Sequence, residues 1–423
     1  MNIFWFRRDL RLNDNIGLHE ALKSGKVHPI FIFDEIILDK LEKNDSRLNF
    51  IYETLEKINL KLSEYYTSIK YYYGNPSDIW LDIIKDNNID NVYWNKDYEP
   101  YALKRDCNIQ NILDKNNIQS YSFKDQVIFE ESEILKNDGT PYTIYTPYKN
   151  KWLSRIREPQ LINSVDLFHN FIKNREKNFK LSSLGFIKSK ISVKPYTFSN
   201  VSHYHEIRDY PAKDQTSYLS PHLRFGTISV RECVLKALKE NDIFLSELIW
   251  REFFKQIIYH FPYVINKPFK EKYNKIKWIN NSNDFKKWKL GLTGYPMVDA
   301  GMRQLNQTGY MHNRVRMITA SFLVKHLLID WRLGEAYFAK KLLDYDLSAN
   351  NGNWQWAAGT GCDSAPYFRI FNPIEQLKKF DTNLNYVHNW VKDFKNDSYP
   401  EPMIDHKLAR QRCLETYKIG LNS

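Results

Sequence analysis

In the first 125 residues, short runs of β-branched and aromatic residues alternate with stretches of helical periodicity, and no other feature constrains the fold as much. Helical patterns lie near residues 46–64, 76–87 and 99–116. The runs are expected to form strands, and they cover residues 2–6, 28–33, 67–73, 90–94 and 119–123. Strands that alternate with helices predict a parallel, Rossmann-like sheet with helices on its faces.

The rest of the chain divides into a loosely patterned stretch and a helical region. From about residue 124 to residue 200, Lys, Ser, Asn and Pro interrupt the periodicity, which indicates a connector with short helices. Beyond residue 201, a 3.6-residue repeat predicts helices over 246–261, 298–308, 312–330 and 334–343. We therefore expect an α/β domain over residues 1–125, an interdomain linker over 126–200 and an all-helical domain over 201–423.

The composition favours an anionic partner. The net charge is +11 and the isoelectric point is about 9.1, so nucleic acid is the leading candidate. Lys, Asn, Ile and Tyr are all abundant, and an AT-biased genome is the alternative explanation for the charge. The α/β region has neither a GxGxxG nor a GxxxxGK[ST] motif, so it lacks the usual signature of a dinucleotide or nucleoside-triphosphate site.

The cysteines and the apolar runs indicate a cytoplasmic protein. The four cysteines form no CxxC pair and no Cys/His group with zinc spacing, so reduced thiols and no metal site are expected. The chain has no run of 18 apolar residues, so no membrane span is expected. Charged residues follow a five-residue apolar run at the N-terminus, which differs from a signal peptide.

The run from Asp344 to Pro373 has the residue mixture of a ligand site. It holds two acids, two adjacent asparagines, a Trp-Gln-Trp sequence and a turn that ends in PYFRIFNP. The acids and amides could meet the polar edge of a flat ligand, and the tryptophans could supply aromatic surfaces. On residue types alone, a buried aromatic turn with satisfied polar groups is the alternative.

This run closely resembles the flavin-binding core of the DNA photolyase/cryptochrome family, and Trp-Gln-Trp is similar to the photolyases that act on cyclobutane dimers. Five more motifs occur in the family's order: WFRRDLRLNDN (Trp5–Asn15), RDYPAKDQTSYLSPHLRFGTIS (Arg208–Ser229), SELIWREFF (Ser246–Phe254), GYPMVDAGMRQL (Gly294–Leu305) and GYMHNRVRMITASFLVKHLLIDWRLGE (Gly309–Glu335). Class I cyclobutane pyrimidine dimer photolyases are the subfamily that the chain resembles most. The resemblance implies an α/β domain followed by a helical domain that binds FAD.

The resemblance also implies which residues hold FAD, whose reduced form is the active one. Asp346 would accept from the imide edge of the ring, Asp344 would pair with Arg316, and Asn350 would face flavin N5. The residues expected around the cofactor are Tyr204, Thr216, Ser217, Tyr218, Leu219, Ser220, Arg316, Asp344, Tyr345, Asp346 and Asn350. Trp354, Trp331 and Trp278 match an electron relay that runs from the flavin to the surface.

The lesion-binding residues follow from the same resemblance. The target is damaged DNA, single- or double-stranded, with the pyrimidine dimer flipped out of the stack. Trp250 and Trp356 would form stacking walls, and Glu247 would hydrogen-bond the pyrimidine edge. By the same resemblance, photolyases that repair the six-four photoproduct have histidines at the positions of Asn313 and Met317. Because neither residue is a histidine in this chain, the cyclobutane lesion is favoured. Contacts at the rim of the DNA site are expected from Arg208, Arg251, Arg314 and Gln376.

The site for a second, antenna chromophore departs from the family pattern. Tyr101 and Ala102 stand where folate-binding relatives commonly carry Asn-Glu. This departure argues against a methenyltetrahydrofolate antenna and leaves a deazaflavin, another flavin or an empty site as alternatives.

We expect a monomeric, light-driven DNA repair enzyme. One alternative is a cryptochrome-like blue-light receptor without repair activity, which predicts a long C-terminal extension, a lost lesion pocket or a changed residue opposite N5. The other is a non-catalytic nucleic-acid-binding protein, which would need neither flavin nor relay.

Overall fold

The computed structural model describes residues 1–174 and 179–422. The chain forms two compact units, each built from separate segments. The first comprises Met1–Ile134, Trp152–Thr197 and Tyr218–Glu252, and the second comprises Leu135–Lys151, Phe198–Ser217 and Phe253–Ser423. The division predicted at residues 125 and 200 stays a prediction, and residues 175–178 and 423 of its last two parts lie outside the described residues.

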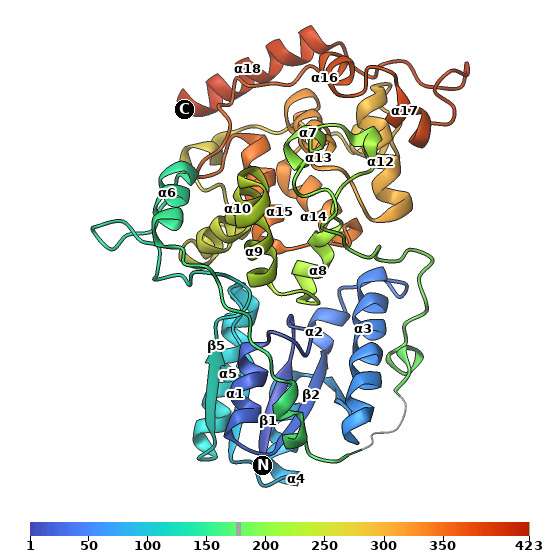
Figure 1. Cartoon of the computed structure of the whole chain (residues 1–423). Helices are drawn as coiled ribbons and strands as arrows, with labels where there is room; N and C mark the ends of the chain where they lie inside the picture. The colour runs from blue at the N-terminus through green and yellow to red at the C-terminus, as the bar shows by residue number, and fades with distance from the viewer. Residues whose placement is uncertain (175–178, 423) are drawn as a thin grey trace. The chain divides into compact units, whose positions relative to one another are not determined.

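The first unit contains a five-stranded sheet in the order β3-β2-β1-β4-β5 (Figure 1). Its strands are β1 (Asn2–Phe6), β2 (Val27–Asp34), β3 (Lys70–Gly74), β4 (Asn91–Asn95) and β5 (Gln119–Phe123). Every neighbouring pair is parallel, as predicted. The third strand begins three residues later than its sequence pattern indicates. β1 and β2 are buried along their whole lengths, because helices cover both faces of the sheet.

Alternate residues of the strands pack into two separate cores. Phe4 and Phe31 belong to the core that includes α1 (Ile16–Ser24) and α3 (Ser46–Leu62). Trp5 and Ile30 belong to the core on the other side, which includes α4 (Pro76–Asp86) and α5 (Pro100–Lys115). The side-chain period of two along each strand sends neighbouring residues to opposite faces.

The first unit also contains residues that come much later in the chain. They form α8 (Leu219–Phe225), α9 (Val230–Glu240) and the first part of α10 (Asp242–His260). Gly226 ends α8 with φ +67°, and an added Cβ would lie 2.0 Å from the Arg8 carbonyl oxygen. A side chain at this position would therefore be both strained and in collision with backbone.

The other short elements are α2 (Glu35–Leu38), η1 (Ser63–Tyr65), η2 (Val165–Asn170) and η3 (Leu181–Leu184). α6 (Tyr145–Arg155) spans a boundary of the two units.

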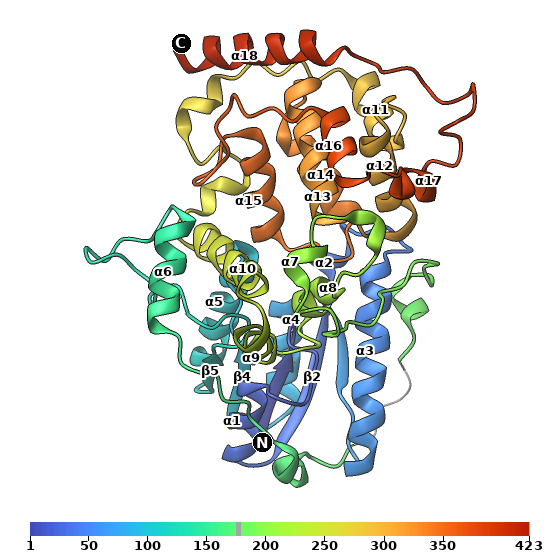
Figure 2. The same ribbon diagram turned by 45° about the horizontal axis from the view of Figure 1, so that its top comes forward.

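The second unit is helical, as predicted (Figure 2). Its longer helices are the end of α10, α11 (Ser282–Leu290), α12 (Pro296–Thr308), α13 (Asn313–Ser321), α14 (Trp331–Lys341), α15 (Leu347–Ala358), α16 (Pro373–Phe380) and α18 (His406–Asn422). Shorter elements are α7 (Tyr204–Ile207), η4 (Pro211–Lys213), η5 (Pro262–Ile265), η6 (Glu271–Lys275) and α17 (Asn385–Trp390).

One predicted helix is wrong in its extent. The continuous helix expected over 312–330 ends as α13 at Ser321 and continues only as the π-helix η7 (Phe322–His326). Leu328 then has φ +49°, which no helix continues through. Asp330 starts α14 instead, because its carboxylate accepts a hydrogen bond from the Arg332 N–H at 3.0 Å.

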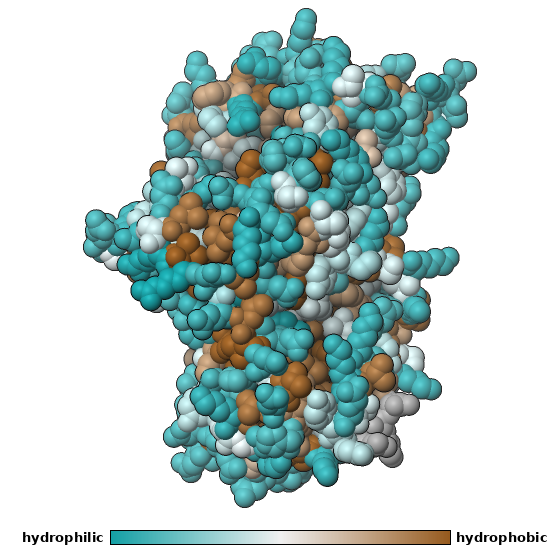
Figure 3. Space-filling model, in the orientation of Figure 1, coloured by the Kyte–Doolittle hydropathy of each residue, from teal (hydrophilic) through white to brown (hydrophobic). Residues whose placement is uncertain are grey.

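Hydrophilic residues cover most of the face drawn in Figure 3, with apolar patches between them. Among residues 1–174 and 179–422, every helix is too short or too polar to cross a lipid bilayer.

Candidate functional site

The predicted flavin residues Asp344, Tyr345, Asp346 and Asn350 lie where α14 and α15 pack together in the second unit. Asp344 and Asp346 lie in the short connection between these helices, and Asp346 starts α15 by accepting from the Ala349 N–H at 3.2 Å. Gly334 of α14 allows the close approach, because an added Cβ would lie 2.2 Å from the Trp354 ring. The sequence between the two acids and Trp354 therefore forms one rigid, well-packed element.

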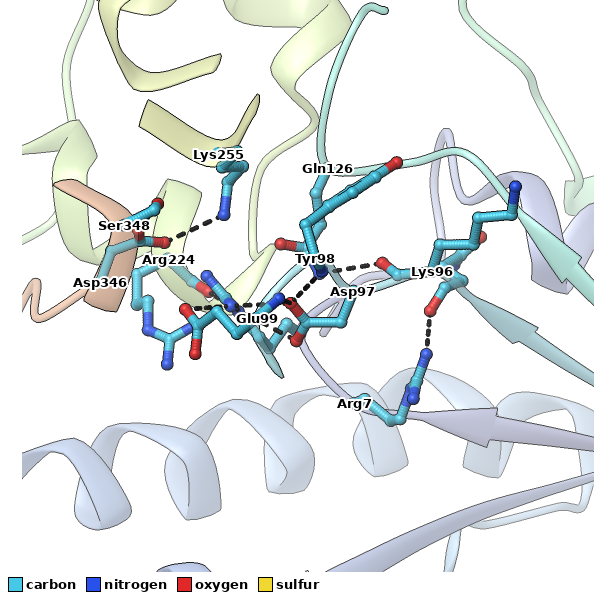
Figure 4. Close-up of polar contacts among 12 residues, drawn as sticks. Arg7, Lys96, Asp97, Tyr98, Glu99, Gln126, Arg224, Lys255, Asp346 and Ser348 are labelled. Carbon is cyan, nitrogen blue, oxygen red and sulfur yellow. Dashed lines mark hydrogen bonds and ion pairs between the residues drawn. The ribbon is translucent and has the colours of Figure 1, made fainter. Parts of the chain in front are cut away.

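Two ion pairs fix the two acids. The Arg316 guanidinium donates to Asp344 at 2.8 Å, which places these two residues together as the resemblance implies. The Lys255 ammonium donates to Asp346 at 3.1 Å, a contact that the sequence did not predict (Figure 4). The second carboxylate oxygen of Asp344 is buried and has no hydrogen-bond partner in the protein. A ligand with N–H or O–H donors would satisfy it.

Asn350 is buried and adjoins a second acid that sequence reasoning missed. Its side-chain amide donates to the Glu335 backbone carbonyl at 3.1 Å. Burial raises the pKa of the Glu335 carboxyl to about 7, and one of its oxygens has no partner. The sequence held one signal for Glu335. It lies four residues after Trp331, so the two side chains lie on the same face of a helix, and that face packs against the core.

These residues fit a flavin. The unsatisfied oxygens of Asp344 and Glu335 are acceptors, and the ring edge and sugar-like chain of FAD carry donors. Asn350 offers an amide beside them. In the part of the chain that the structure describes, no group of three or more His, Cys, Asp or Glu could hold a metal ion.

The predicted phosphate-binding stretch is divided between the two units. Tyr204 and the segment 216–217 belong to the second unit, whereas the segment 218–220 belongs to the first. α8 begins within this stretch, at Leu219. The Tyr218 hydroxyl accepts from the Lys194 ammonium at 2.7 Å. The role of these residues in holding pyrophosphate stays a prediction.

The three relay tryptophans belong to or pack against one core cluster in the second unit. Trp354 and Trp331 are 2% and 1% exposed, and Trp278 is half-buried. Trp278 is thus the most exposed of the three, and their role as a relay stays a prediction. The structure adds a fourth indole, Trp288, whose ring centroid lies 6.2 Å from that of Trp354. Trp288 is completely buried and donates to the Thr319 carbonyl at 3.1 Å.

The predicted lesion residues also come from both units. Glu247 and Trp250 lie on α10 in the first unit, and both are half-buried. Asn313 at the start of α13 is exposed, and Met317 one turn later is half-buried. Trp356 of α15 is half-buried, and the Arg369 guanidinium lies 5.7 Å from the centre of its ring. That these five residues form one pocket stays a prediction.

The arginines predicted at the DNA rim make specific internal contacts. Arg314 donates to Asp209 at 2.5 Å and lies over the Phe380 ring at 4.4 Å. Arg208 lies over the Tyr204 ring at 5.4 Å. Arg251 donates to the Gln126 carbonyl at 2.7 Å within the first unit.

The basic charge of residues 303–341 is largely neutralised inside the second unit. Four arginines of this segment form ion pairs with acids, namely Arg303, Arg314, Arg316 and Arg332. Lys325 is 1% exposed, so it cannot contact a phosphate from its present position. A count of charges along the sequence therefore overstates the positive charge that this segment offers to DNA. Gln376 is half-buried on α16.

The departure at the antenna position has a structural consequence. The Tyr101 hydroxyl donates to Asp34 at 2.7 Å, and Ala102 is buried. Nearby, Glu99 pairs with Arg8 at 2.7 Å and with Arg224 at 3.4 Å, and Figure 4 labels Glu99 and Arg224. The polar side chains of this segment are thus engaged within the first unit, and no carboxylate stands at position 102.

Replacing Glu335 by Gln should remove a pH dependence from the stability of the protein without added FAD. The folded-state pKa of about 7 lies above the usual value, so the stability from this group is present at low pH and lost as pH rises through 7. At pH 8 the variant should exceed the wild type by on the order of 1–3 kcal/mol, and near pH 4 the two should agree. Urea unfolding across this range gives the difference, and parallel curves for the two proteins would contradict the prediction.

Two family models together match most of the chain. The model described as DNA photolyase matches residues 2–164, and the FAD binding domain of DNA photolyase matches residues 244–397. A deoxyribodipyrimidine photo-lyase of Vibrio cholerae is 34% identical over 467 residues, which cover 99% of both chains.

Solved structures agree with these matches over the full length. A bacterial class III photolyase from Agrobacterium tumefaciens has a TM-score of 0.89 and 33% identity, covering 100% of this chain and 98% of that one. An archaeal photolyase from Sulfolobus tokodaii with two FAD molecules has a TM-score of 0.83 and 33% identity, covering 99% of this chain and 100% of that one.

Proposed function

The chain belongs to the DNA photolyase family, and on that premise we propose that it uses light to repair cyclobutane pyrimidine dimers in DNA. The observation that carries the proposal is the set of buried, partly unsatisfied acceptors around α15, in a segment that matches the family's FAD-binding domain. When bound and reduced, FAD supplies the electron that opens the dimer under light.

The residues of the chain would position the cofactor and hold its surroundings fixed. Arg316 holds Asp344 and Lys255 holds Asp346, so both side chains would be oriented as acceptors for donors on the ring. Asn350 is held by the Glu335 carbonyl and presents its amide oxygen. The buried tryptophans around α14 and α15 exclude water from this region.

The dimer must leave the base stack before it can react. Extrusion costs a few kcal/mol and costs less for a damaged step that stacks and pairs poorly. Trp250 and Trp356 would stack on the extruded bases, and Glu247 would donate to or accept from their polar edge. Asn313 and Met317 would complete the contacts, and neither is the histidine that six-four repair is expected to need.

Repair of a defined thymine dimer, in darkness and under blue light, tests this function. FAD-loaded, reduced protein should remove the dimer only in the light and should leave six-four photoproducts unchanged. Equal dimer loss in both conditions would contradict the proposal. Light-driven flavin reduction without any repair would instead support the blue-light receptor, and failure to bind FAD would reject both.

Replacing Trp250 by Ala should weaken binding to dimer-containing duplex by on the order of 1–3 kcal/mol and affect intact duplex little, because one stacking surface is lost. Arg314→Ala is the comparison variant, since a phosphate contact would weaken both duplexes and flatten the dependence of affinity on salt. Titrations at several salt concentrations measure both effects. Unchanged lesion preference in Trp250→Ala would place the pocket elsewhere.

The remaining assignments follow from the same premise. We propose an antenna chromophore other than folate, or none, because position 102 carries Ala and Tyr101 is engaged by Asp34. A monomer is proposed, and light scattering of the FAD-loaded protein tests it. All four cysteines lie in the described residues and are free, which supports a cytoplasmic location.

A further inference from the structure

Lys255 is an almost completely buried cation at the start of the predicted flavin site. It lies on α10, and its side chain is 2% exposed. A lysine is almost never buried to this degree without a partner, because removing its charge from water is costly. Its ammonium lies 3.1 Å from Oδ2 of Asp346, within the second unit (Figure 4).

Asp346 is held on both of its oxygens. Oδ2 accepts from Lys255, and Oδ1 accepts from the Ala349 N–H at 3.2 Å and from the Ser348 hydroxyl. The Lys255 ammonium fixes one carboxylate oxygen, and the Ser348 hydroxyl and Ala349 N–H at the start of α15 fix the other. Asp346 therefore has a single orientation, and it stays an ionised acceptor as long as Lys255 stands beside it.

The charge of Lys255 is less screened than that of the other site cation. Arg316, which pairs with Asp344, has a side chain that is 28% exposed, against 2% for Lys255. Solvent weakens the field of an exposed charge far more than that of a buried one. Added negative charge near Asp346 is therefore stabilised mainly by Lys255.

Burial alone does not link a lysine to the flavin site, as a comparison of Lys255 with Lys325 shows. Lys325 is also buried in the second unit, but it donates to the Ala358 carbonyl at 2.8 Å and to the Tyr367 carbonyl at 3.3 Å. It tethers a turn and touches neither acid of the site. Lys255 differs because its partner is the very carboxylate that the proposed function assigns to the flavin ring.

We propose that Lys255 is a positioning residue of the flavin site, which holds Asp346 ionised and oriented toward the ring and whose buried positive charge favours reduced over oxidised FAD. The proposal rests on the proposed function, since it requires FAD to bind beside Asp346. Reduction takes two electrons from dithionite and one proton from water, so the cofactor gains one negative charge, and this charge is the one that Lys255 stabilises.

Four variants of the full-length protein test the proposal: Lys255→Met, Lys255→Arg, Lys255→Gln, and Lys325→Met as the matched buried control. FAD affinity is measured by titration of apoprotein. The ratio of reduced to oxidised flavin is measured spectroscopically during dithionite titration with reference dyes.

Lys255→Met should bind FAD at least tenfold more weakly. At a fixed solution potential, its ratio of reduced to oxidised flavin should be tenfold lower, which corresponds to a flavin reduction potential lower by about 30 mV for a two-electron couple. Lys255→Arg should restore both values toward wild type. Lys325→Met should lower the unfolding midpoint and leave the ratio unchanged. If Lys255→Met does not fold, Lys255→Gln, which is neutral but keeps a polar donor beside Asp346, should show the same shift in ratio.

The inference fails if Lys255→Met, or Lys255→Gln in its place, keeps the wild-type ratio. It also fails if Lys325→Met shifts the ratio as much, because the effect would then reflect loosened packing. Wild-type protein that does not bind FAD at all would overturn the proposed function itself, and the inference with it.

Discussion

Blue-light reduction of oxidised FAD is expected to be nearly lost when Trp331 is replaced by Phe, whereas the same variant, chemically reduced beforehand, should repair dimers at near wild-type efficiency. Trp331 is 1% exposed and belongs to the same core cluster as Trp354, and the half-buried Trp278 packs against that cluster. A phenyl ring is much harder to oxidise than an indole, so the substitution interrupts the path to the surface. Repair does not use this path, because the electron returns from the opened dimer.

Trp288→Phe is the control for this prediction. Trp288 lies 6.2 Å from Trp354 and is 0% exposed. Trp288 lies outside the predicted relay, so this variant should keep photoreduction. Flavin absorbance under illumination with external reductant measures all the variants. Trp278→Phe should behave like Trp331→Phe, and unimpaired photoreduction in both would show that these residues serve only packing. Trp354→Phe is less informative, because Trp354 also packs edge-on against Phe338.

Replacing Asp125 by Asn is expected to destabilise the first unit by about 3–5 kcal/mol, because it leaves buried guanidinium groups without their counter-charge. Asp125 is 2% exposed and accepts from Arg11 at 2.6 Å and from Arg231 at 2.8 Å. Burial alone raises the pKa of this carboxyl, but the two arginines outweigh it and hold the pKa below its usual value. Its stabilisation is therefore present at neutral pH and is lost as pH falls through the folded pKa.

Urea unfolding at pH 7 and at low pH tests this prediction. The gap between wild type and Asp125→Asn should narrow toward low pH, where the wild-type carboxyl is protonated too. Glu375→Gln is the control, because its pairing with Lys378 is exposed and should change stability by less than about 1 kcal/mol. A variant as stable as wild type at pH 7 would show that Arg231, which also contacts Asp14 at 2.8 Å, needs no second acid.

The sheet was predictable from the sequence because its strands are short, strongly apolar and separated by clear helical periods. The first and last strands were predicted at their observed bounds. The helix over Asn313–Ser321 was predicted too long, because no periodicity reveals a π-turn or the positive φ of Leu328. The return of residues 218–252 to the first unit could not be predicted, since it depends on ion pairs far apart in the sequence, such as that between Asp125 and Arg231.

The candidate site was only partly predictable. The pairing of Asp344 with Arg316 was predicted and is observed at 2.8 Å. Lys255 and Glu335 were missed, because an isolated charged residue in a helix reads as a solvent-facing side chain until its burial is known. The contact of Arg314 with Asp209 could not be predicted either, because the two residues lie far apart in the sequence, and the role of Arg314 at the DNA rim stays a prediction.

The discontinuous make-up of the first unit also affects how the protein emerges from the ribosome. Its sheet is complete at residue 123, but the segment 218–252 belongs to the same unit. At about 5–20 residues per second, translation needs on the order of ten seconds to pass from Asp125 to the end of that segment. During this interval Asp125 lacks Arg231, and the nascent sheet lacks part of its cover. A chain truncated near residue 200 should therefore aggregate or recruit chaperones, and slow codons between residues 125 and 252 would prolong the exposure.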